Sequence, residues 1–427
     1  MEYANHLPPP AGKRIVIIGA GFAGLQLARR LRKSSYQLVL IDKNNYHQFQ
    51  PLFYQVATSG LEPSSICFPL RKIFQKQKNI HIRIASVQSV DPSAHCIHTS
   101  IGPITYDYLV LATGCDTNFY GNKNIIVHAM PMKSVGEALA LRNHILQNFE
   151  NRINASDDPE KYLNLVITGG GATGVEVAGT LAEMRSHVLP KDYPEMDFSR
   201  LRIFLLEGNK RLLSSFNEKL SAKANQYLQE LGVDVKLGVM VKDYDGETIQ
   251  LSDGTKIVSN TLVWAAGVTG NQIEGISPQS MERGQRYKVN PYNMIEGYDD
   301  IFAIGDICYM SESDYPNGHP QVAQVAIQQG KNLAGNFLKM ASGKKQEPFS
   351  YRDLGSMATI GRHKAVVEIE HIRTYGFVAW FVWMFVHLMA LVGVKNKLII
   401  FINWLWHYVT YDQSLRLILS PRSKKES

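Results

Sequence analysis

Short runs of aliphatic and β-branched residues recur along the chain, and several are followed by segments whose apolar positions have helical spacing. The runs at 15–18, 38–41, 165–167 and 203–206 each predict a buried strand, because continuous apolar residues are typical of strands covered on both faces. Strands that alternate with helices in this way predict an α/β fold.

A later segment, VAQVAIQQGKNLAGNF at 322–337, has the spacing of an amphipathic helix. Gln324 and Gln328 stand four residues apart and therefore lie on one side of it. Either they face water, as most polar residues on a surface helix do, or they are uncharged hydrogen-bonding arms aimed at a ligand. The segment by itself favours the first interpretation. Its apolar side is predicted to consist of Val322, Val325, Ala326, Leu333 and Phe337.

The first strand runs directly into a glycine motif. Gly19, Gly21 and Gly24 have the spacing GxGxxG, and then a helical pattern begins. The first glycine permits a tight turn, the second leaves room for a pyrophosphate, and the third lets the helix pack on the strand. The next strand ends in Asp42, at the usual distance for binding a ribose hydroxyl. The complete set predicts a dinucleotide site.

The same pattern occurs a second time. Gly169, Gly171 and Gly174 follow the strand at 165–167, and the next strand ends in Glu207. A carboxylate at that position favours the free 2′-hydroxyl of NADH and repels the 2′-phosphate of NADPH. Two such folds in one chain suggest two dinucleotides, one a prosthetic group and the other a substrate.

Three further strands end in small or acidic residues and fit this organisation. One ends in Ala112-Thr113-Gly114, and its counterpart in the second half ends in Ala265-Ala266-Gly267. A third, IFAIGD, ends in Gly305-Asp306.

Composition narrows the choice of partners. The chain has 427 residues, a net charge of +7, 45% hydrophobic residues and 19% charged residues. A basic chain could bind nucleic acid or an anionic membrane surface, but no basic-aromatic run supports nucleic acid. The four cysteines form no CxxC pair and the histidines have no metal-site spacing, so we expect reduced thiols and no metal.

The C-terminal quarter contains an apolar segment at 376–394 without Asp, Glu, Lys or Arg. About 20 apolar residues are enough to span a bilayer, so the segment could span, lie in the interface or pack in a core. Lys395 and Lys397 follow, and then a second apolar segment rich in Trp and Tyr, which suits a membrane surface.

At this point the sequence closely resembles the type II NADH dehydrogenases, single-subunit NADH:quinone oxidoreductases that do not pump protons. The resemblance runs from about Lys13 to Leu419 and is carried by IVIIGAGFAGL, NNYHQFQPLFYQVATSGLEPSSI, ITGGGATGVEVAG, IFAIGD, AQVAIQQG, GSMATIGRHKAV and FVHLMALVGVKNKLIIFINWLWHYVTYD. It implies two Rossmann-like domains and a C-terminal helical region that anchors to the membrane. The expected divisions are 12–122 and 291–345 for FAD, 123–290 for NADH and 346–427 for the membrane.

The resemblance also implies roles for individual residues. Non-covalent FAD would be held by the first glycine motif and Asp42, with Asp306 at the ribityl chain, and NADH by the second motif and Glu207. The expected cofactor contacts are Gly19, Ala20, Gly21, Phe22, Ala23, Gly24, Asp42, Gln55, Thr58, Thr113, Gly114, Gly169, Gly171, Thr173, Gly174, Glu207, Ala266, Gly267, Gly305, Asp306 and Ala323.

In the family, a hydride passes from NADH to FAD N5 and two electrons then reduce a membrane quinone, either ubiquinone or menaquinone. Gln324 and Gln328 would meet the quinone, which reverses the preference drawn from their helix alone. Glu176 would lie near the nicotinamide and flavin. The alternative is that its negative charge only interacts favourably with the helix dipole in the first turn. Thr180 stands where many relatives have a second glutamate.

The resemblance implies monotopic attachment to the cytoplasmic face of the inner membrane, in preference to one spanning helix near 376–394. A homodimer is plausible because an exposed apolar C-terminus invites partners. Two alternatives stay open: a sulfide:quinone oxidoreductase, which needs cysteines at the flavin and has Cys115 and Cys308 nearby, or a membrane-attached NADH-sensing flavoprotein.

Overall fold

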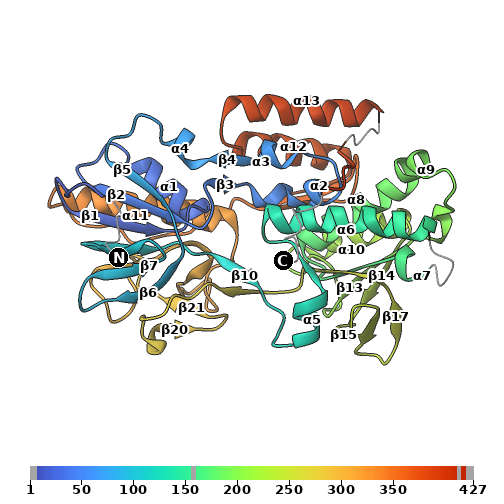
Figure 1. The fold of residues 1–427 in the computed structure, drawn as a ribbon, viewed down its shortest axis with the longest axis horizontal. Coiled ribbons are helices and arrows are strands. Elements are labelled where there is room, and N and C mark those ends of the chain that lie inside the picture. Colours follow the sequence, from blue (N-terminus) through green and yellow to red (C-terminus); the bar gives the residue numbers. More distant parts are fainter. Residues whose placement is uncertain (1–6, 155–159, 411–414, 420–427) are drawn as a thin grey trace, which may run out of the picture. The chain divides into compact units, whose positions relative to one another are not determined.

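The computed structural model describes residues 7–154, 160–410 and 415–419, and Figure 1 draws the chain as a ribbon. The chain forms two compact units, which are described separately. Unit 1 consists of residues 1–48, 67–116 and 268–353, and unit 2 of residues 49–66, 117–267 and 354–427.

Unit 1 is built on a parallel five-stranded sheet in the order β22-β9-β1-β2-β5. Its strands are β1 Arg14–Ile18, β2 Gln37–Asp42, β5 Ile80–Ile84, β9 Tyr108–Leu111 and β22 Ile301–Ala303. Helices α1 (Phe22–Leu31) and α11 (Ala323–Ala341) pack against each other, and Gly330 allows α11 to approach the backbone of Ala23. The predicted strands at 15–18 and 38–41 are therefore central strands of one sheet.

Smaller elements complete unit 1. They are β3 Tyr46–Gln48, β4 Cys67–Pro69, α4 Leu70–Ile73, β6 Val87–Asp91, β7 Cys96–Thr99, β8 Gly102–Thr105, β20 Met281–Glu282, β21 Arg286–Lys288, η3 Pro278–Ser280, η4 Gly305–Ile307 and β23 Cys308–Tyr309. The chain passes between the units within β10 (Cys115–Thr117) and before β19 (Val268–Gly270). A hydrophobic core joins one face of the large sheet to strands β6–β8.

Unit 2 repeats the same design with the order β11-β18-β12-β13-β14. The strands, all parallel, are β11 Met130–Pro131, β12 Asn164–Thr168, β13 Arg202–Glu207, β14 Val233–Leu237 and β18 Thr261–Trp264. Its main helices are α6 Val135–Asn154, α8 Ala172–His187 and α10 Glu218–Glu230.

The other elements of unit 2 are η1 Gln50–Leu52, α2 Phe53–Ala57, α3 Pro63–Ile66, α5 Lys123–His128, α7 Glu160–Leu163, α9 Leu189–Asp192, η2 Phe198–Arg200, β15 Val241–Tyr244, β16 Thr248–Leu251, β17 Lys256–Val258, β24 Ser356–Thr359, β25 Ala365–Ile369, β26 Ile372–Tyr375, α12 Phe377–Ala390 and α13 Val394–Thr410. Residues 49–66 and 354–427 belong to this unit because α2 packs on α6 and α8, and β24 packs on α8.

The amphipathic helix predicted at 322–337 exists as α11, and Val325, Ala326, Leu333 and Phe337 are all buried. Val322 is instead the N-cap residue and is 38% exposed, because the helix begins after it. The predicted domain boundaries at 122, 290 and 345 stay predictions. The compact units divide after residues 48, 66, 116, 267 and 353.

Candidate functional site

The first glycine loop has the shape that its sequence predicts. Gly19 has φ of +103°, and a Cβ there would lie 2.2 Å from the carbonyl oxygen of Ala112. A Cβ on Gly24 would lie 1.9 Å from the carbonyl oxygen of Gly19. By contrast, a Cβ on Gly21, the N-cap of α1, would meet nothing within 4 Å. The loop is closed at the strand and open at the helix end, where a phosphate needs room.

Asp42 fixes this loop from the end of β2. The backbone N–H of Ala20 donates to its Oδ2 at 2.7 Å, and the N–H of Asn44 donates to Oδ1 at 2.7 Å. Burial raises the carboxyl pKa, and these two hydrogen bonds oppose the rise. Each carboxylate oxygen has a second lone pair, so the group can also accept from a ribose hydroxyl.

The loop of unit 2 has the same construction. Gly169 has φ of +108°, and a Cβ on Gly174 would lie 1.9 Å from the Gly169 carbonyl oxygen. The N–H of Gly170 donates to Glu207 Oε2 at 2.5 Å. Glu207 Oε1 accepts from the backbone N–H and the side-chain amide of Asn209. Both units therefore hold an acidic side chain at the carboxyl end of a strand, beside the N-terminus of a helix.

In unit 1, Gly305 and Asp306 begin a short 3₁₀ helix. The Gly305 N–H donates to Gln329 Oε1 at 2.7 Å, and Gln329 is only 1% exposed. Cys115 Sγ donates to Asp306 Oδ2 at 3.0 Å. Gln329 and Cys115 had no predicted role at this loop. A sequence signal for Gln329 was available. It stands three or four residues from Ala326, Val325 and Leu333, so helical spacing places it on the predicted apolar side of α11.

Thr113 and Gly114 are both held by Asn271 of the same unit. The Thr113 hydroxyl donates to the carbonyl oxygen of Asn271 at 2.7 Å, and the N–H of Asn271 donates to the carbonyl oxygen of Gly114. The Asn271 side-chain amide also donates to the Thr113 carbonyl oxygen at 3.2 Å. The backbone after β9 is therefore fixed where a cofactor contact is predicted.

Gln324 and Gln328 both contact the segment at 352–353. The Gln328 side chain donates to the carbonyl oxygen of Arg352 at 2.8 Å and accepts from the N–H of Arg352 at 3.0 Å. Gln324 donates to Asp353 Oδ1 at 3.3 Å. Both amides therefore form hydrogen bonds within unit 1.

Glu176 is buried on α8 in unit 2 and is only 7% exposed. The N–H of Thr359 approaches its Oε1 at 3.4 Å, and the Trp383 indole lies close enough to favour the charged form without a well-formed hydrogen bond. Burial outweighs both and raises the pKa to about 8. Glu176 is the fifth residue of the helix, so the alternative of a dipole partner in the first turn is wrong.

Tyr54 and Gln55 begin a chain of side-chain hydrogen bonds beside this carboxyl group. The Tyr54 hydroxyl lies 3.1 Å from Thr359 Oγ1, and Gln55 Nε2 donates to the Tyr54 oxygen at 2.9 Å. The Trp404 indole N–H donates to Gln55 Oε1 at 2.8 Å. Residues far apart in the sequence thus form one polar chain, and burial raises the pKa of Tyr54.

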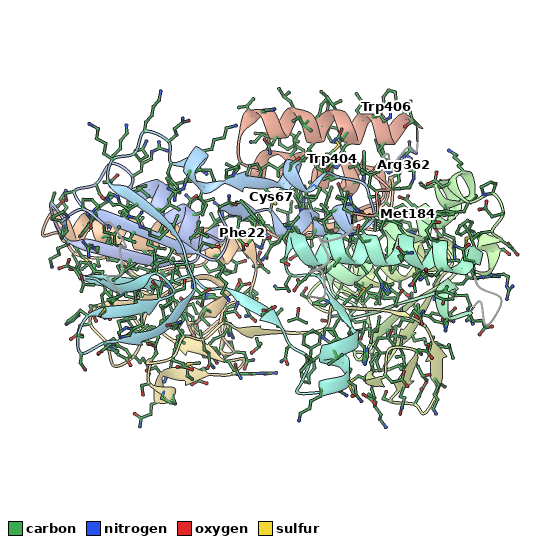
Figure 2. The ribbon with its side chains drawn as sticks, viewed as in Figure 1. Phe22, Cys67, Met184, Arg362, Trp404 and Trp406 are labelled. Carbon is green, nitrogen blue, oxygen red and sulfur yellow. The ribbon has the colours of Figure 1, made fainter. Side chains whose placement is uncertain are left out.

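A partly open cavity of about 620 Å³, counting its mouth, lies within unit 2. Its walls come from the α2 segment, α8, the loop after β24, α12 and α13. Trp404 points from α13 toward this region, whereas Trp406 points away, as Figure 2 shows. Gln55 and Thr58, both predicted near the flavin, line the cavity. The lining consists of Tyr54, Gln55, Thr58, Gly60, Thr180, Glu183, Thr359, Gly361, Arg362, Trp380, Trp383, Met384, Trp404, His407 and Tyr408.

A second acidic residue, Glu183, lines this cavity although no role was predicted for it. Its Oε1 accepts a short hydrogen bond from the backbone N–H of Arg362. Burial raises its pKa to about 7, and the nearby Arg362 and Lys364 oppose that rise. The Arg362 guanidinium lies over the Tyr408 ring at 4.7 Å, a distance typical of a cation–π contact.

Comparison with known proteins places this geometry in a family. The model of the pyridine nucleotide-disulphide oxidoreductases matches residues 13–330, and that of the NDH2 C-terminal domain matches residues 354–410. The type II NADH:quinone oxidoreductase Ndh of Mycobacterium tuberculosis is 38% identical, covering 93% of this chain and 88% of that protein. The chain belongs to the type II NADH:quinone oxidoreductases.

Other members of the type II NADH:quinone oxidoreductase family agree with this assignment. The Staphylococcus aureus enzyme of that name is 30% identical over 83% of this chain and 89% of its own length. The solved structure of NDH2 from Plasmodium falciparum in complex with NADH has a TM-score of 0.87 and 20% identity, over 96% of this chain and 100% of that one. A sulfide:quinone oxidoreductase from Aquifex aeolicus has a TM-score of 0.70 at 18% identity, over 96% of both chains. The last two comparisons establish a shared fold.

The C-terminal helices of this type II enzyme are shorter than the apolar stretch at 376–394 suggested. Helix α12 ends at Ala390, and α13 begins at Val394 after Gly393, which has φ of +82°. Within residues 7–154, 160–410 and 415–419, no helix has both the length and the apolar character needed to cross a bilayer.

Proposed function

We propose that the chain oxidises NADH and reduces a membrane quinone, with non-covalent FAD as its resident cofactor. The observation that carries the proposal is the pair of matching glycine loops, each with a carboxylate hydrogen-bonded to the loop at the carboxyl end of the next strand. The names of the relatives support the same reaction.

The loop of unit 1 fits the adenosine end of FAD, because Gly21 leaves space at the helix N-terminus and Asp42 stands beside it. Asp306 would accept from the ribityl chain, and Gln329 holds its loop through the N–H of Gly305. When bound, FAD supplies the redox chemistry between the nicotinamide and the quinone.

The loop of unit 2 fits NADH. Glu207 would accept from the ribose 2′-hydroxyl, and its charge would repel the 2′-phosphate of NADPH. Its carboxylate is kept in place by Gly170 and Asn209, so little conformational entropy remains to be lost when the nucleotide binds.

The cavity of unit 2 suits a quinone ring. Flat aromatic walls favour a flat ring. The walls include Trp380, Trp383, Trp404 and Tyr408, while Tyr54 and Gln55 bring polar groups to the lining. Glu176, next to Tyr54 and Thr359, would hold or relay a proton. The contacts of Gln324 and Gln328 with a quinone stay predictions.

Stopped-flow spectroscopy of the FAD-loaded protein tests this function. We expect NADH to bleach the flavin absorbance and a short-chain quinone to restore it rapidly. Thr180→Phe places a ring in the cavity, so we expect the quinone concentration for half-maximal recovery to rise at least tenfold, about 1.4 kcal/mol. Bleaching by NADH should not change.

Thr180→Ser is the matched control, because serine keeps the hydroxyl that donates to the carbonyl oxygen of Glu176 at 2.8 Å. Normal quinone recovery in Thr180→Phe would remove the cavity from the proposal. Bleaching without recovery in the wild type would contradict quinone reduction and favour the alternative of an NADH sensor.

The sulfide:quinone alternative requires reactive cysteines. All four cysteines are free thiols, and burial raises the pKa of Cys308 to about 12, which keeps that thiol protonated at neutral pH. The Cys115 thiol donates a hydrogen bond to Asp306 Oδ2. These contacts favour structural thiols over a sulfide-oxidising pair.

We also propose that α12 and α13 attach the protein to a lipid bilayer in a monotopic manner, on the cytoplasmic face of the inner membrane. Their exposed apolar side chains form the apolar surface of unit 2: Phe377, Val378, Phe381, Phe385, Val386, Met389, Val394, Leu398, Phe401, Ile402, Leu405, Trp406 and Val409. Contiguous exposed apolar residues of this kind mark membrane or protein contacts.

Vesicle binding tests the attachment. The double variant Phe381→Glu with Leu405→Glu changes two side chains that are each 54% exposed. We expect its partition into anionic vesicles to fall at least tenfold, because each lost apolar contact is worth about 1.5–3 kcal/mol. The matched control is Ile126→Glu with Val127→Glu, two exposed apolar residues on α5.

Equal vesicle binding by the two double variants would contradict the attachment. The expected homodimer stays a prediction. Sedimentation without lipid tests it. If the wild type is a dimer and the Phe381→Glu, Leu405→Glu variant is a monomer, the same surface pairs two chains.

A further inference from the structure

The starting point is a polar column along α8. Glu176, Thr180 and Glu183 are separated by four and three residues, so they lie on one side of the helix. The two carboxyl groups are two helical turns apart, about 10 Å along the axis. Thr180 and Glu183 line the cavity, whereas Glu176 lies behind it against Thr359.

Glu183 is enclosed by the loop that follows β24. A Cβ on Gly361 would lie 2.9 Å from its carboxyl carbon, and Gly361 has φ of +67°, so a glycine at this position lets the backbone close over the carboxyl group. The Arg362 N–H then donates to Oε1.

The charged and titratable groups around Glu183 come from three other segments. The loop after β24 brings Arg362 and Lys364, and the Lys364 ammonium is engaged at 2.6 Å by Glu230. Tyr54 of the α2 segment interacts electrostatically with Glu183, and α13 brings His407 and Tyr408 to the same cavity. The residues that α12 adds to the cavity, Trp380, Trp383 and Met384, carry no charge.

We propose that Glu183 is the proton donor through which the cavity takes up its solvent proton during quinone reduction. The inference rests on the proposed function. Oxidation of NADH by a quinone consumes one proton from the medium: NADH, H⁺ and quinone give NAD⁺ and quinol. The Glu183 carboxyl O–H bond breaks, a new O–H bond forms on one quinone oxygen, and solvent returns a proton to the carboxylate. The electron pair and the hydrogen of the other quinol O–H group are those that NADH gives up as hydride.

Two features favour Glu183 over Glu176 for exchange with solvent. Glu183 is partly exposed and reaches an open cavity, whereas Glu176 is buried. A general acid works best when its pKa lies near the working pH, and burial places that of Glu183 at about 7. Many relatives have a glutamate where this chain has Thr180, whose side chain is not an acid. Glu183, three residues later, supplies a carboxyl group on the same side of the helix.

The test compares Glu183→Gln with wild type by stopped-flow. Glutamine retains an oxygen that can accept the Arg362 N–H, so we expect normal FAD content and normal bleaching by NADH. We expect recovery of the flavin absorbance by a short-chain quinone to slow by at least tenfold at pH 7. In the wild type this recovery should slow as the pH rises through about 7, and the break should be absent in Glu183→Gln.

Glu195→Gln is the matched control, because Glu195 is an exposed glutamate in a loop of the same unit. Glu183→Asp keeps a carboxyl group and should restore a pH break, and it provides the kinetic test if the glutamine variant fails to hold FAD. Infrared difference spectra supply a readout other than turnover: a protonated-carboxyl band that titrates near pH 7 should disappear in Glu183→Gln.

Recovery and pH profile in Glu183→Gln that match those of Glu195→Gln would overturn the assignment while leaving quinone reduction intact. A wild type that quinone does not reoxidise at all would instead remove the proposed function, and the inference with it.

Discussion

Gly24→Ala is expected to yield protein that binds FAD at least about a hundredfold more weakly, a loss of about 3 kcal/mol. The added methyl group would lie 1.9 Å from the carbonyl oxygen of Gly19, and it also meets Ala112. Neither contact is the end of a flexible side chain, so α1 must move away from β1 and the loop must open. Flavin absorbance after purification, with a fluorescence titration of added FAD, measures the loss.

The equivalent change in unit 2 should separate the two dinucleotides. Gly174→Ala makes the same 1.9 Å contact with the carbonyl oxygen of Gly169. We expect this variant to retain FAD, because its glycine loop is not the one of unit 1, and to require at least tenfold more NADH for bleaching.

Controls for these variants come from glycines in open positions. A Cβ on Gly335 of α11 meets nothing within 4 Å, and a Cβ on Gly136 of α6 meets only Ser134 Oγ at 3.9 Å. Alanine at such helical positions usually stabilises by about 0.5–1 kcal/mol. Loss of FAD in Gly335→Ala, or retention of full FAD affinity in Gly24→Ala, would contradict the assignment of the first loop.

The second large effect is expected from Glu176→Gln, which should raise stability at alkaline pH. Burial lifts the pKa of this carboxyl group from its ordinary value of 4.5 to about 8. The folded protein therefore holds a proton between pH 4.5 and 8 that the unfolded chain releases, so its free energy of unfolding falls as the pH rises through this window. Each pKa unit corresponds to about 1.4 kcal/mol, so the fall attributable to Glu176 is a few kcal/mol.

Glutamine carries no ionisable proton and can still accept the Thr359 N–H. We expect Glu176→Gln to match the wild type near pH 5 and to exceed its stability by a few kcal/mol above pH 8. Urea unfolding at pH 5, 6.5 and 8 measures the difference, with Glu195→Gln as the control that keeps the wild-type slope. A slope in Glu176→Gln as steep as that of the wild type would show that the carboxyl group is not buried uncharged in solution.

Glu176→Gln also tests the proton relay. If its quinone-driven recovery and the pH dependence of that recovery are unchanged, Glu176 does not relay protons. If its recovery is slowed, combining it with Glu183→Gln shows whether the two groups act in series, since residues of one chain of transfers give non-additive effects.

Local sequence determined the two dinucleotide loops. The conformations of Gly19 and Gly169, the close approaches of Gly24 and Gly174, and the positions of Asp42 and Glu207 all follow from a strand, a tight turn and a helix that are contiguous in the chain. Folding adds one contact to each loop, because Gly19 approaches the carbonyl oxygen of Ala112 and Gly169 that of Ala265, each at the end of a later strand. The family assignment depended more on the segments PLFYQVAT and AQVAIQQG than on the glycine motifs, and it is confirmed.

Tertiary structure decided which side chains gather around the cavity. Trp404 and Gln55 are hydrogen-bonded although they are 349 positions apart, and Thr359 reaches Glu176 across 183 positions. Gln328 and Gln329 are adjacent on α11 but point about 100° apart. Gln328 donates to Arg352, whereas Gln329 is buried and accepts from Gly305.

Sequence and tertiary structure also contribute differently to the ionisation of Glu176 and Glu183. The sequence places both residues on one face of a helix, but their pKa values depend on how much water the surrounding segments remove. That desolvation comes from β24 and its loop, α12 and the α2 segment, which are brought to α8 only by folding. Residue identity and helical spacing were thus fixed by the sequence itself, whereas the protonation chemistry was decided by packing between segments that are distant in the chain.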